Sequence, residues 1–243
     1  MTMVPAARSR YIGGMHEPAE LDHLDVWIFD LDNTLYPARC NLFAQIDQRM
    51  GEFIADLLDL DFTAARHLQK SHYRQHGTTL RGLMIEHGID PHGFLDYVHD
   101  IDYSPVPASP DLDAALERLP GRKFVFTNGT VAHAERTMEQ LGIGGHFEAI
   151  FDIVASDFVP KPNAEPYRAF IDRHDIRPEG AAFFEDIAKN LLAPHALGMT
   201  TVWVPGGGDW AADGADGAHV HHVVEDLAGW LAAAKVRAPQ TPS

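Results

Sequence analysis

The chain has 243 residues, of which 45% are hydrophobic and 22% charged, a composition typical of a globular protein with a sizeable buried core. Lysine and arginine total 19 against 35 aspartates and glutamates, so the formal net charge is 19 − 35 = −16. This negative charge disfavours a nucleic-acid polymer or an anionic membrane as partner and favours a small molecule.

Residues 1–22 are predicted to be a polar lead-in, because they lack the apolar segment of a secretory signal. The single cysteine, Cys40, cannot form an internal disulfide and fits a reducing compartment. No apolar run in the sequence approaches the roughly 18 residues that a membrane span needs. We therefore expect a cytoplasmic protein without a membrane partner.

Apolar runs alternate with helical patterns along most of the chain. The runs are residues 26–29, 124–126, 150–154, 181–184, 201–204 and 220–224, and the helical patterns between them are residues 131–141, 166–174 and 191–197. This alternation predicts an α/β fold with a doubly wound, Rossmann-like parallel sheet. Ligands of such sheets bind at the carboxyl ends of the strands.

A second pattern interrupts this alternation between residues 38 and 107. Apolar residues there follow helical spacing, with further helices expected at residues 62–76 and 93–99. We predict a helical cap domain over residues 38–107, inserted into an α/β core formed by residues 23–37 and 108–236. Residues 237–243 are expected to be a frayed tail.

Two aspartates directly follow the first predicted strand. Asp30 and Asp32 stand in the sequence Asp-Leu-Asp-Asn-Thr, where a turn can direct both carboxylates into one pocket. Such a pair suits a nucleophile beside a proton donor. The same residue types are also common in turns and at helix N-caps, so the motif alone leaves both interpretations open.

The next two motifs offer groups that can hold a phosphate. Thr127, Asn128 and Gly129 lie between an apolar run and a helix, where a hydroxyl and backbone N–H groups can bind an anion. An ordinary strand-to-helix turn would also use these residues. Lys161 lies between two prolines, which restrict its position, although most lysines are solvated surface residues.

Glu185 and Asp186 place two acids after another predicted strand. Paired oxygens at a strand end suit Mg²⁺, which prefers carboxylates, water and substrate phosphate. The alternative is a pair of acids that complement a helix dipole.

Together the four motifs resemble those of the haloacid dehalogenase superfamily of phosphohydrolases. Asp30 to Thr34 is similar to its first motif, Thr127 to its second, Lys161 to its third, and Glu185-Asp186 to its fourth. The resemblance extends over about residues 26–230, and the insertion corresponds to a C1 cap. Residues 29–37 and 73–83 are most similar to the pyrimidine 5′-nucleotidase branch. Glu185 and Ile187 depart from that branch, which usually has aspartate and serine there.

The resemblance implies a Mg²⁺-dependent phosphomonoesterase. It implies that Asp30 is the nucleophile, which forms an aspartyl-phosphate, and that Asp32 is the general acid and base. It assigns the metal to Asp30, the backbone carbonyl of Asp32, Asp186 and Glu185. The remaining groups, which stabilise the phosphate oxygens, are Thr127, Asn128, Gly129 and Lys161.

The cap is expected to select the leaving group, because the phosphoryl centre is the same in all phosphate monoesters. The resemblance implies a pyrimidine nucleoside 5′-monophosphate as the small phosphorylated substrate, with Arg81 as a cap contact. An ordinary surface arginine is the other interpretation of Arg81.

Several alternatives stay open. A phosphomutase would use the same residues, and a broad sugar-phosphate phosphatase would differ only in its cap. A non-catalytic binding or regulatory module would be expected to have eroded motifs, whereas all four are intact. Hydrolytic dehalogenation is disfavoured, because departure of a halide needs no acid/base such as Asp32. His219, His221 and His222 could bind a transition metal or follow strand alternation.

Overall fold

The computed structural model describes residues 9–11, 19–206 and 208–237. Most of the expected lead-in and tail, residues 1–8, 12–18 and 238–243, therefore lies outside the described residues. Within the lead-in, residues 9–11 form an edge strand of the sheet. No helix in the described ranges is long and apolar enough to cross a membrane.

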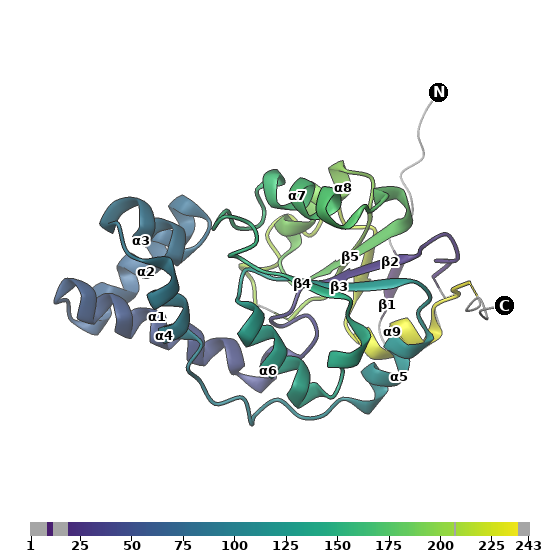
Figure 1. Ribbon diagram of the computed structural model, residues 1–243. Coiled ribbons are helices and arrows are strands. Elements are labelled where there is room, and N and C mark those ends of the chain that lie inside the picture. Colours follow the sequence, from purple (N-terminus) through teal and green to yellow (C-terminus); the bar gives the residue numbers. More distant parts are fainter. Residues whose placement is uncertain (1–8, 12–18, 207, 238–243) are drawn as a thin grey trace.

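A parallel sheet forms the centre of the core (Figure 1). In the described part of the chain it has seven strands in the order β1-β7-β6-β5-β2-β3-β4. The strands are β1 (Ser9–Tyr11), β2 (Val26–Phe29), β3 (Arg122–Phe126), β4 (Ala149–Phe151), β5 (Ala181–Glu185), β6 (Thr200–Trp203) and β7 (His222–Val224). After the edge strand β1, the chain builds outward from β2 through β3 to β4, and then continues on the other side of β2 with β5. The doubly wound core expected from the sequence is thus confirmed, with its switch point at β2.

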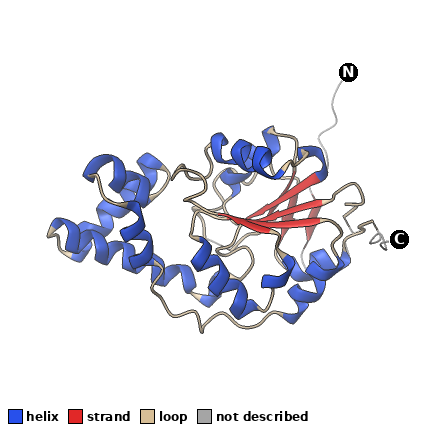
Figure 2. Cartoon of the chain, viewed as in Figure 1, coloured by secondary structure: helices blue, strands red, loops and turns tan. Residues whose placement is uncertain are grey.

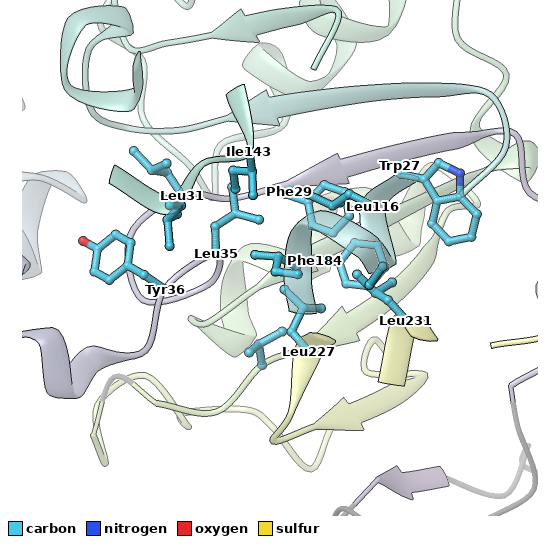
Figure 3. Close-up of a cluster of buried hydrophobic side chains, with 14 of the residues drawn as sticks. Trp27, Phe29, Leu31, Leu35, Tyr36, Leu116, Ile143, Phe184, Leu227 and Leu231 are labelled. Carbon is cyan, nitrogen blue, oxygen red and sulfur yellow. The ribbon is translucent and has the colours of Figure 1, made fainter. Parts of the chain in front are cut away.

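Helices cover both faces of the sheet (Figures 1 and 2). The longer core helices are α5 (Pro110–Arg118), α6 (Val131–Leu141), α7 (Ala164–His174), α8 (Leu192–Ala196) and α9 (Leu227–Ala233). Side chains alternate along β2, so Trp27 and Phe29 pack toward Leu231 of α9 while Ile28 packs on the opposite face with Phe170 of α7. Figure 3 shows the first of these clusters, in which Phe29 and Phe184 stack with ring centroids 4.4 Å apart.

The insertion after β2 forms a helical layer at one end of the core (left in Figure 1). Its helices are α1 (Leu42–Leu58), α2 (Phe62–His76), α3 (Thr79–His87) and α4 (Pro91–Val98). Three of these helices have an N-cap side chain. Backbone N–H groups in the first turns of α2, α3 and α4 donate hydrogen bonds to the side chains of Asp61, Thr78 and Asp90, respectively. The cap has its own apolar core around Ile54, Leu83 and other buried residues.

Some elements differ in extent from the sequence expectations. Residues 150–154 were expected to be one strand, but β4 ends at Phe151 because Asp152 accepts hydrogen bonds from the N–H groups of Val131 and Ala155 and begins a turn. The helix expected at residues 191–197 is a 3₁₀ turn followed by α8. The 3₁₀ turns are Ala38–Cys40, Gly144–His146, Pro178–Gly180 and Ala188–Leu191.

Candidate active site

Three neighbouring strands deliver the motif residues to one edge of the sheet. Asp30 and Asp32 follow β2, Thr127 follows β3, Glu185 ends β5 and Asp186 follows it. Because β3 and β5 pair with β2 on its two sides in parallel, their carboxyl ends lie together. The sheet therefore brings residues that are far apart in the sequence into one site.

Lys161 comes from the loop between β4 and α7 and is buried at the centre of this site. Its Nζ donates hydrogen bonds to Asp30 Oδ1 at 2.6 Å, to Glu185 Oε2 at 2.7 Å and to the Phe126 carbonyl at 3.1 Å. Its backbone N–H donates to Asn128 Oδ1 at 3.0 Å, which ties the loop to the end of β3. Burial lowers the pKa of Lys161, but the charges of Asp30 and Glu185 outweigh it, so the net shift is upward and the ammonium stays protonated.

Three buried carboxylates surround this one ammonium. One oxygen each of Asp30, Glu185 and Asp186 lies within 4.8 Å of the others. Burial, followed by repulsion from Glu185, raises the pKa of Asp30 to about 7. The same two causes raise the pKa of Asp186. Lys161 neutralises only part of this charge, so the donor set fits a divalent cation with oxygen ligands such as Mg²⁺.

Asp32 has a different environment from Asp30. Its Oδ1 accepts a hydrogen bond from Tyr36 Oη at 2.5 Å and lies 2.8 Å from His133 Nε2. Burial raises the pKa of Asp32, but the contacts with His133 and Tyr36 outweigh it and hold the pKa below its usual value. Both contacts use Oδ1, so Oδ2 is the oxygen that can serve a bound molecule.

His133 and Tyr36 were missed by the sequence analysis. His133 lies in the first turn of α6 with an unexposed side chain, and its Nδ1 is 3.0 Å from Tyr103 Oη. Its ring also stacks on His99 of the cap, with centroids 4.6 Å apart. The available signal was the position of His133 just after Thr130, the N-cap of a helix that starts at the site.

Thr127, Asn128 and Gly129 form the turn expected after β3. Thr127 Oγ1 accepts a hydrogen bond from the N–H of Gly129 at 2.9 Å, and the Asn128 side chain supports Lys161. A Cβ at Gly129 would lie 3.1 Å from the His133 ring, which is tighter than ordinary contact. Because residue 129 is a glycine, the backbone can lie close to the ring of His133, which is a partner of Asp32.

A cavity of about 690 Å³ connects these groups to the cap. Its core side includes Asp30, Asp32, Thr127, Lys161 and Asp186, and its cap side includes Phe43, Met50, Tyr73, Phe94 and Leu95. Tyr73 of α2 meets Trp210 of the core edge-on, with ring centroids 5.9 Å apart, and Lys189 Nζ lies 5.4 Å from the Tyr73 ring centre. The cavity therefore has a charged floor, a largely apolar cap wall that also carries Asp47, Lys70 and Arg74, and an aromatic pair shared by cap and core.

Arg81 does not line this cavity. Its Nη1 donates to the Phe158 carbonyl at 3.3 Å. The contact joins cap helix α3 to the core loop before Lys161.

His219 and His221 form hydrogen bonds within the core. His219 Nε2 donates to the Ala188 carbonyl, and His221 Nδ1 accepts from the Thr201 N–H.

Comparison with known proteins agrees with this geometry. The family model described as haloacid dehalogenase-like hydrolase matches residues 24–198, which include all four motifs. The match covers well over half of the chain, so the protein belongs to the haloacid dehalogenase-like hydrolases.

One curated relative and two solved structures illustrate the family. The chain is 27% identical over 220 residues to "Phosphate metabolism protein 8" of Saccharomyces cerevisiae, and the match covers 83% of this chain but 62% of that protein. A phosphatase from Thermococcus onnurineus has a TM-score of 0.56 at 17% identity, covering 84% of this chain and 94% of that chain. A haloacid dehalogenase-like protein from Streptococcus pneumoniae has a TM-score of 0.55 at 15% identity, covering 84% and 95%. At these identities the two structures show a shared fold alone.

Proposed function

We propose that the protein is a Mg²⁺-dependent phosphomonoester hydrolase that acts through an aspartyl-phosphate. The observation that carries the proposal is the opening of Asp30, Asp32 and Lys161 onto one cavity below the cap. Each of the two aspartates has its own set of partners, which suits them to different chemical roles.

In this proposal Asp30 attacks phosphorus and the leaving oxygen departs. Lys161 holds Asp30 Oδ1, and Thr34 Oγ1 donates to Asp30 Oδ2 at 3.0 Å, so the carboxylate is fixed before substrate binds. Such preorganisation removes the need to orient the nucleophile during the reaction. Water then hydrolyses the aspartyl-phosphate and regenerates Asp30.

Asp32 is proposed as the acid that protonates the leaving oxygen and then as the base that takes a proton from water. His133 and Tyr36 hold its Oδ1, which leaves Oδ2 for the leaving group. The two residues act as positioning residues, because they touch Asp32 rather than the phosphoryl group.

Thr127, the backbone N–H groups near Asn128 and Gly129, and Lys161 are proposed to bind the phosphoryl oxygens. Thr127 Oγ1 already accepts from Gly129, so its hydroxyl proton can be donated to a phosphate oxygen. Fixed donors of this kind stabilise charge that spreads over the oxygens in the transition state.

Mg²⁺ would be held by Asp30, Asp186 and the backbone carbonyl of Asp32. Of the two acids in the fourth motif, Glu185 is ion-paired with Lys161 and its Oε1 accepts from the Ile187 N–H at 3.3 Å, whereas Asp186 has no ion pair among the described residues. We therefore assign the direct contact to Asp186 and the support of Lys161 to Glu185. The cation supplies positive charge that offsets repulsion between the anionic nucleophile and the phosphate.

The proposed substrate is a nucleoside 5′-monophosphate, with pyrimidine nucleotides preferred. The volume of the cavity suits a small ligand, and Tyr73 and Trp210 offer aromatic surface for a base. Arg81 enters this proposal through the cap-to-core contact that it makes. A cytoplasmic location is part of the proposal, because the free Cys40 is buried and suits a reducing compartment.

A screen of phosphate monoesters with added Mg²⁺ tests the function. We expect release of inorganic phosphate, with higher kcat/KM for UMP and CMP than for AMP, GMP or sugar phosphates. An isomeric sugar phosphate without free phosphate would identify a phosphomutase. Similar rates with all esters would leave a broad phosphatase and remove the nucleotide preference, and no turnover of any ester would overturn the proposal.

A further inference from the structure

A second cluster of metal-ligating side chains lies in the cap, outside the cavity described above. His72 and His76 are four residues apart on α2, so they project from the same face of the helix. Glu86 reaches them from α3, with Oε1 2.7 Å from His76 Nε2 and 3.5 Å from His72 Nδ1. One ligand atom of each residue lies within 4.8 Å of the other two.

The state of His72 distinguishes this cluster from a surface ion pair. The side chain is 1% exposed, and neither ring nitrogen has a hydrogen-bond partner in the described structure. Buried ring nitrogens normally have hydrogen-bond partners. Two buried nitrogens without one therefore call for an explanation. Burial also lowers the pKa of His72, because it disfavours the charged ring.

Packing between the two helices fixes this ring in place. A Cβ at Gly82 of α3 would collide with His72, so glycine at this position lets α3 close over the ring. His76 and Glu86 are more open, with side chains 20% and 40% exposed. The cluster thus has a buried end, which is rigid, and an open end, where water can complete a coordination shell.

We propose that His72, His76 and Glu86 form a Zn²⁺ site that joins α2 to α3. Two imidazoles and one carboxylate, with water as the fourth ligand, are a ligand set that tetrahedral Zn²⁺ accepts. The nitrogen ligands favour Zn²⁺ over Mg²⁺, which prefers oxygen. This separates the cap site from the all-carboxylate cluster of Asp30, Glu185 and Asp186.

The metal would act on the shape of the cap. Tyr73 follows His72 on α2, and Thr79 and Leu80 begin α3, and all three line the cavity. A cation bound by both α2 and α3 would fix the two helices, and the cavity-lining residues that they carry, relative to one another. The site does not depend on the proposed phosphatase activity, because none of its ligands lines the cavity.

Calorimetric titration of Zn²⁺ into the full chain tests the site, in saturating Mg²⁺ so that the carboxylate cluster is occupied. The informative variants are His76→Gln and Glu86→Gln, which change the open end of the cluster, and circular dichroism checks their fold. His67→Gln is the matched control, because His67 is an exposed histidine on the same helix. Melting temperatures with and without Zn²⁺ give a second readout.

We expect the unmodified chain and His67→Gln to bind one Zn²⁺ that raises the melting temperature. His76→Gln and Glu86→Gln should weaken that event by at least the roughly tenfold that loss of an outer-shell partner costs. The proposal is overturned if no Zn²⁺ binds under saturating Mg²⁺, or if all four proteins bind it equally. If His76→Gln does not fold, the exposed Glu86→Gln decides between these outcomes.

Discussion

The floor and the wall of the cavity are built differently. On the floor, charged groups from three strand ends hold one another, as Lys161 does with Asp30 and Glu185. On the cap wall, apolar side chains such as Phe94 and Leu95 form most of the surface, and the ion pair of Asp47 and Lys70 lies beside them. Under the proposed function, this difference implies that the core sets the reaction while the cap sets which leaving group fits. Changes to the floor should therefore affect alike all substrates whose leaving groups are equally acidic, whereas changes to the wall should depend on the shape of the leaving group.

The largest effect is expected from Asp30→Asn. The amide keeps the shape of the side chain but is not a nucleophile, and none of the other carboxylates occupies its place beside Lys161 and Thr34. Phosphate release should fall to background for every ester, as measured with a purified, folded variant. Asp96→Asn, an exposed aspartate on α4, is the control and should keep full activity. Turnover by Asp30→Asn above background would refute the role of Asp30.

The next effect concerns Asp32 and its positioning residue His133. Asp32→Asn should lower kcat by on the order of 10²–10⁴-fold, with the greater loss for poor leaving groups that need protonation. His133→Ala should lower kcat less and show the same dependence on leaving group, because Asp32 loses one of the two partners that orient it.

A conservative variant separates positioning from simple packing. The amide of His133→Gln can reach as far as Nε2 and donate to Asp32, so it should restore part of the activity that His133→Ala loses. An equal loss in both variants, or a loss independent of the leaving group, would assign His133 to packing alone.

The floor could be predicted from the sequence to a larger extent than its supports. Asp30, Thr127 and Glu185 each follow an apolar run, and parallel strands bring such positions together whatever the connecting helices do. The contact between His133 and Asp32 depends on the rotation of α6 and on a distance across the fold, which local patterns do not encode. The direction of Arg81 is likewise set by the packing of α3 against the loop that holds Phe158.

The fourth motif provides a comparison within the floor itself. Asp186→Asn should weaken the apparent affinity for Mg²⁺ more than Glu185→Gln does, because Glu185 is already engaged with Lys161 and the Ile187 N–H. Glu185→Gln should instead lower kcat at saturating Mg²⁺ by loosening Lys161. Titration of activity with Mg²⁺ separates the two effects. The assignment fails if Glu185→Gln raises the Mg²⁺ requirement more than Asp186→Asn.

Variants at Trp210 and Arg81 test the expected effect of the cap wall on the choice of substrate. Trp210→Leu should lower kcat/KM for UMP by on the order of tenfold, the size of one base-stacking contact. The same variant should leave hydrolysis of glycerol phosphate nearly unchanged, because that ester has no ring to stack. Arg81→Ala should reduce the preference for UMP over glycerol phosphate by a smaller factor, since Arg81 acts through the cap-to-core contact.

Phe62→Leu is the matched control for Trp210→Leu, because Phe62 is an exposed aromatic residue outside the lining of the cavity. It should change neither value of kcat/KM. Equal losses for UMP and glycerol phosphate in Trp210→Leu would contradict the division of labour between floor and wall.

The smallest effect is expected at His99, where cap and core meet. His99 Nδ1 donates to the Leu95 carbonyl within the cap, and its ring stacks on His133 of the core. Burial lowers the pKa of His99 to about 4, with a further contribution from His133, while the charge of Asp32 opposes the shift. In the unfolded chain this pKa is near 6.5.

Between these two pKa values the unfolded chain binds one more proton at this position than the folded protein does. The free energy of unfolding therefore falls as the pH is lowered from 7.5 to 5.0, by up to about 2 kcal/mol from His99 alone. His99→Phe keeps an aromatic ring against His133 but cannot be protonated, so urea unfolding should show a smaller loss of stability over this pH range. His67→Phe, in the exposed part of α2, should lose as much as the unmodified chain. An unchanged pH dependence in His99→Phe would mean that the seam between cap and core does not exclude the charged ring, and that the cap is less closely joined to the floor than the stacked histidines indicate.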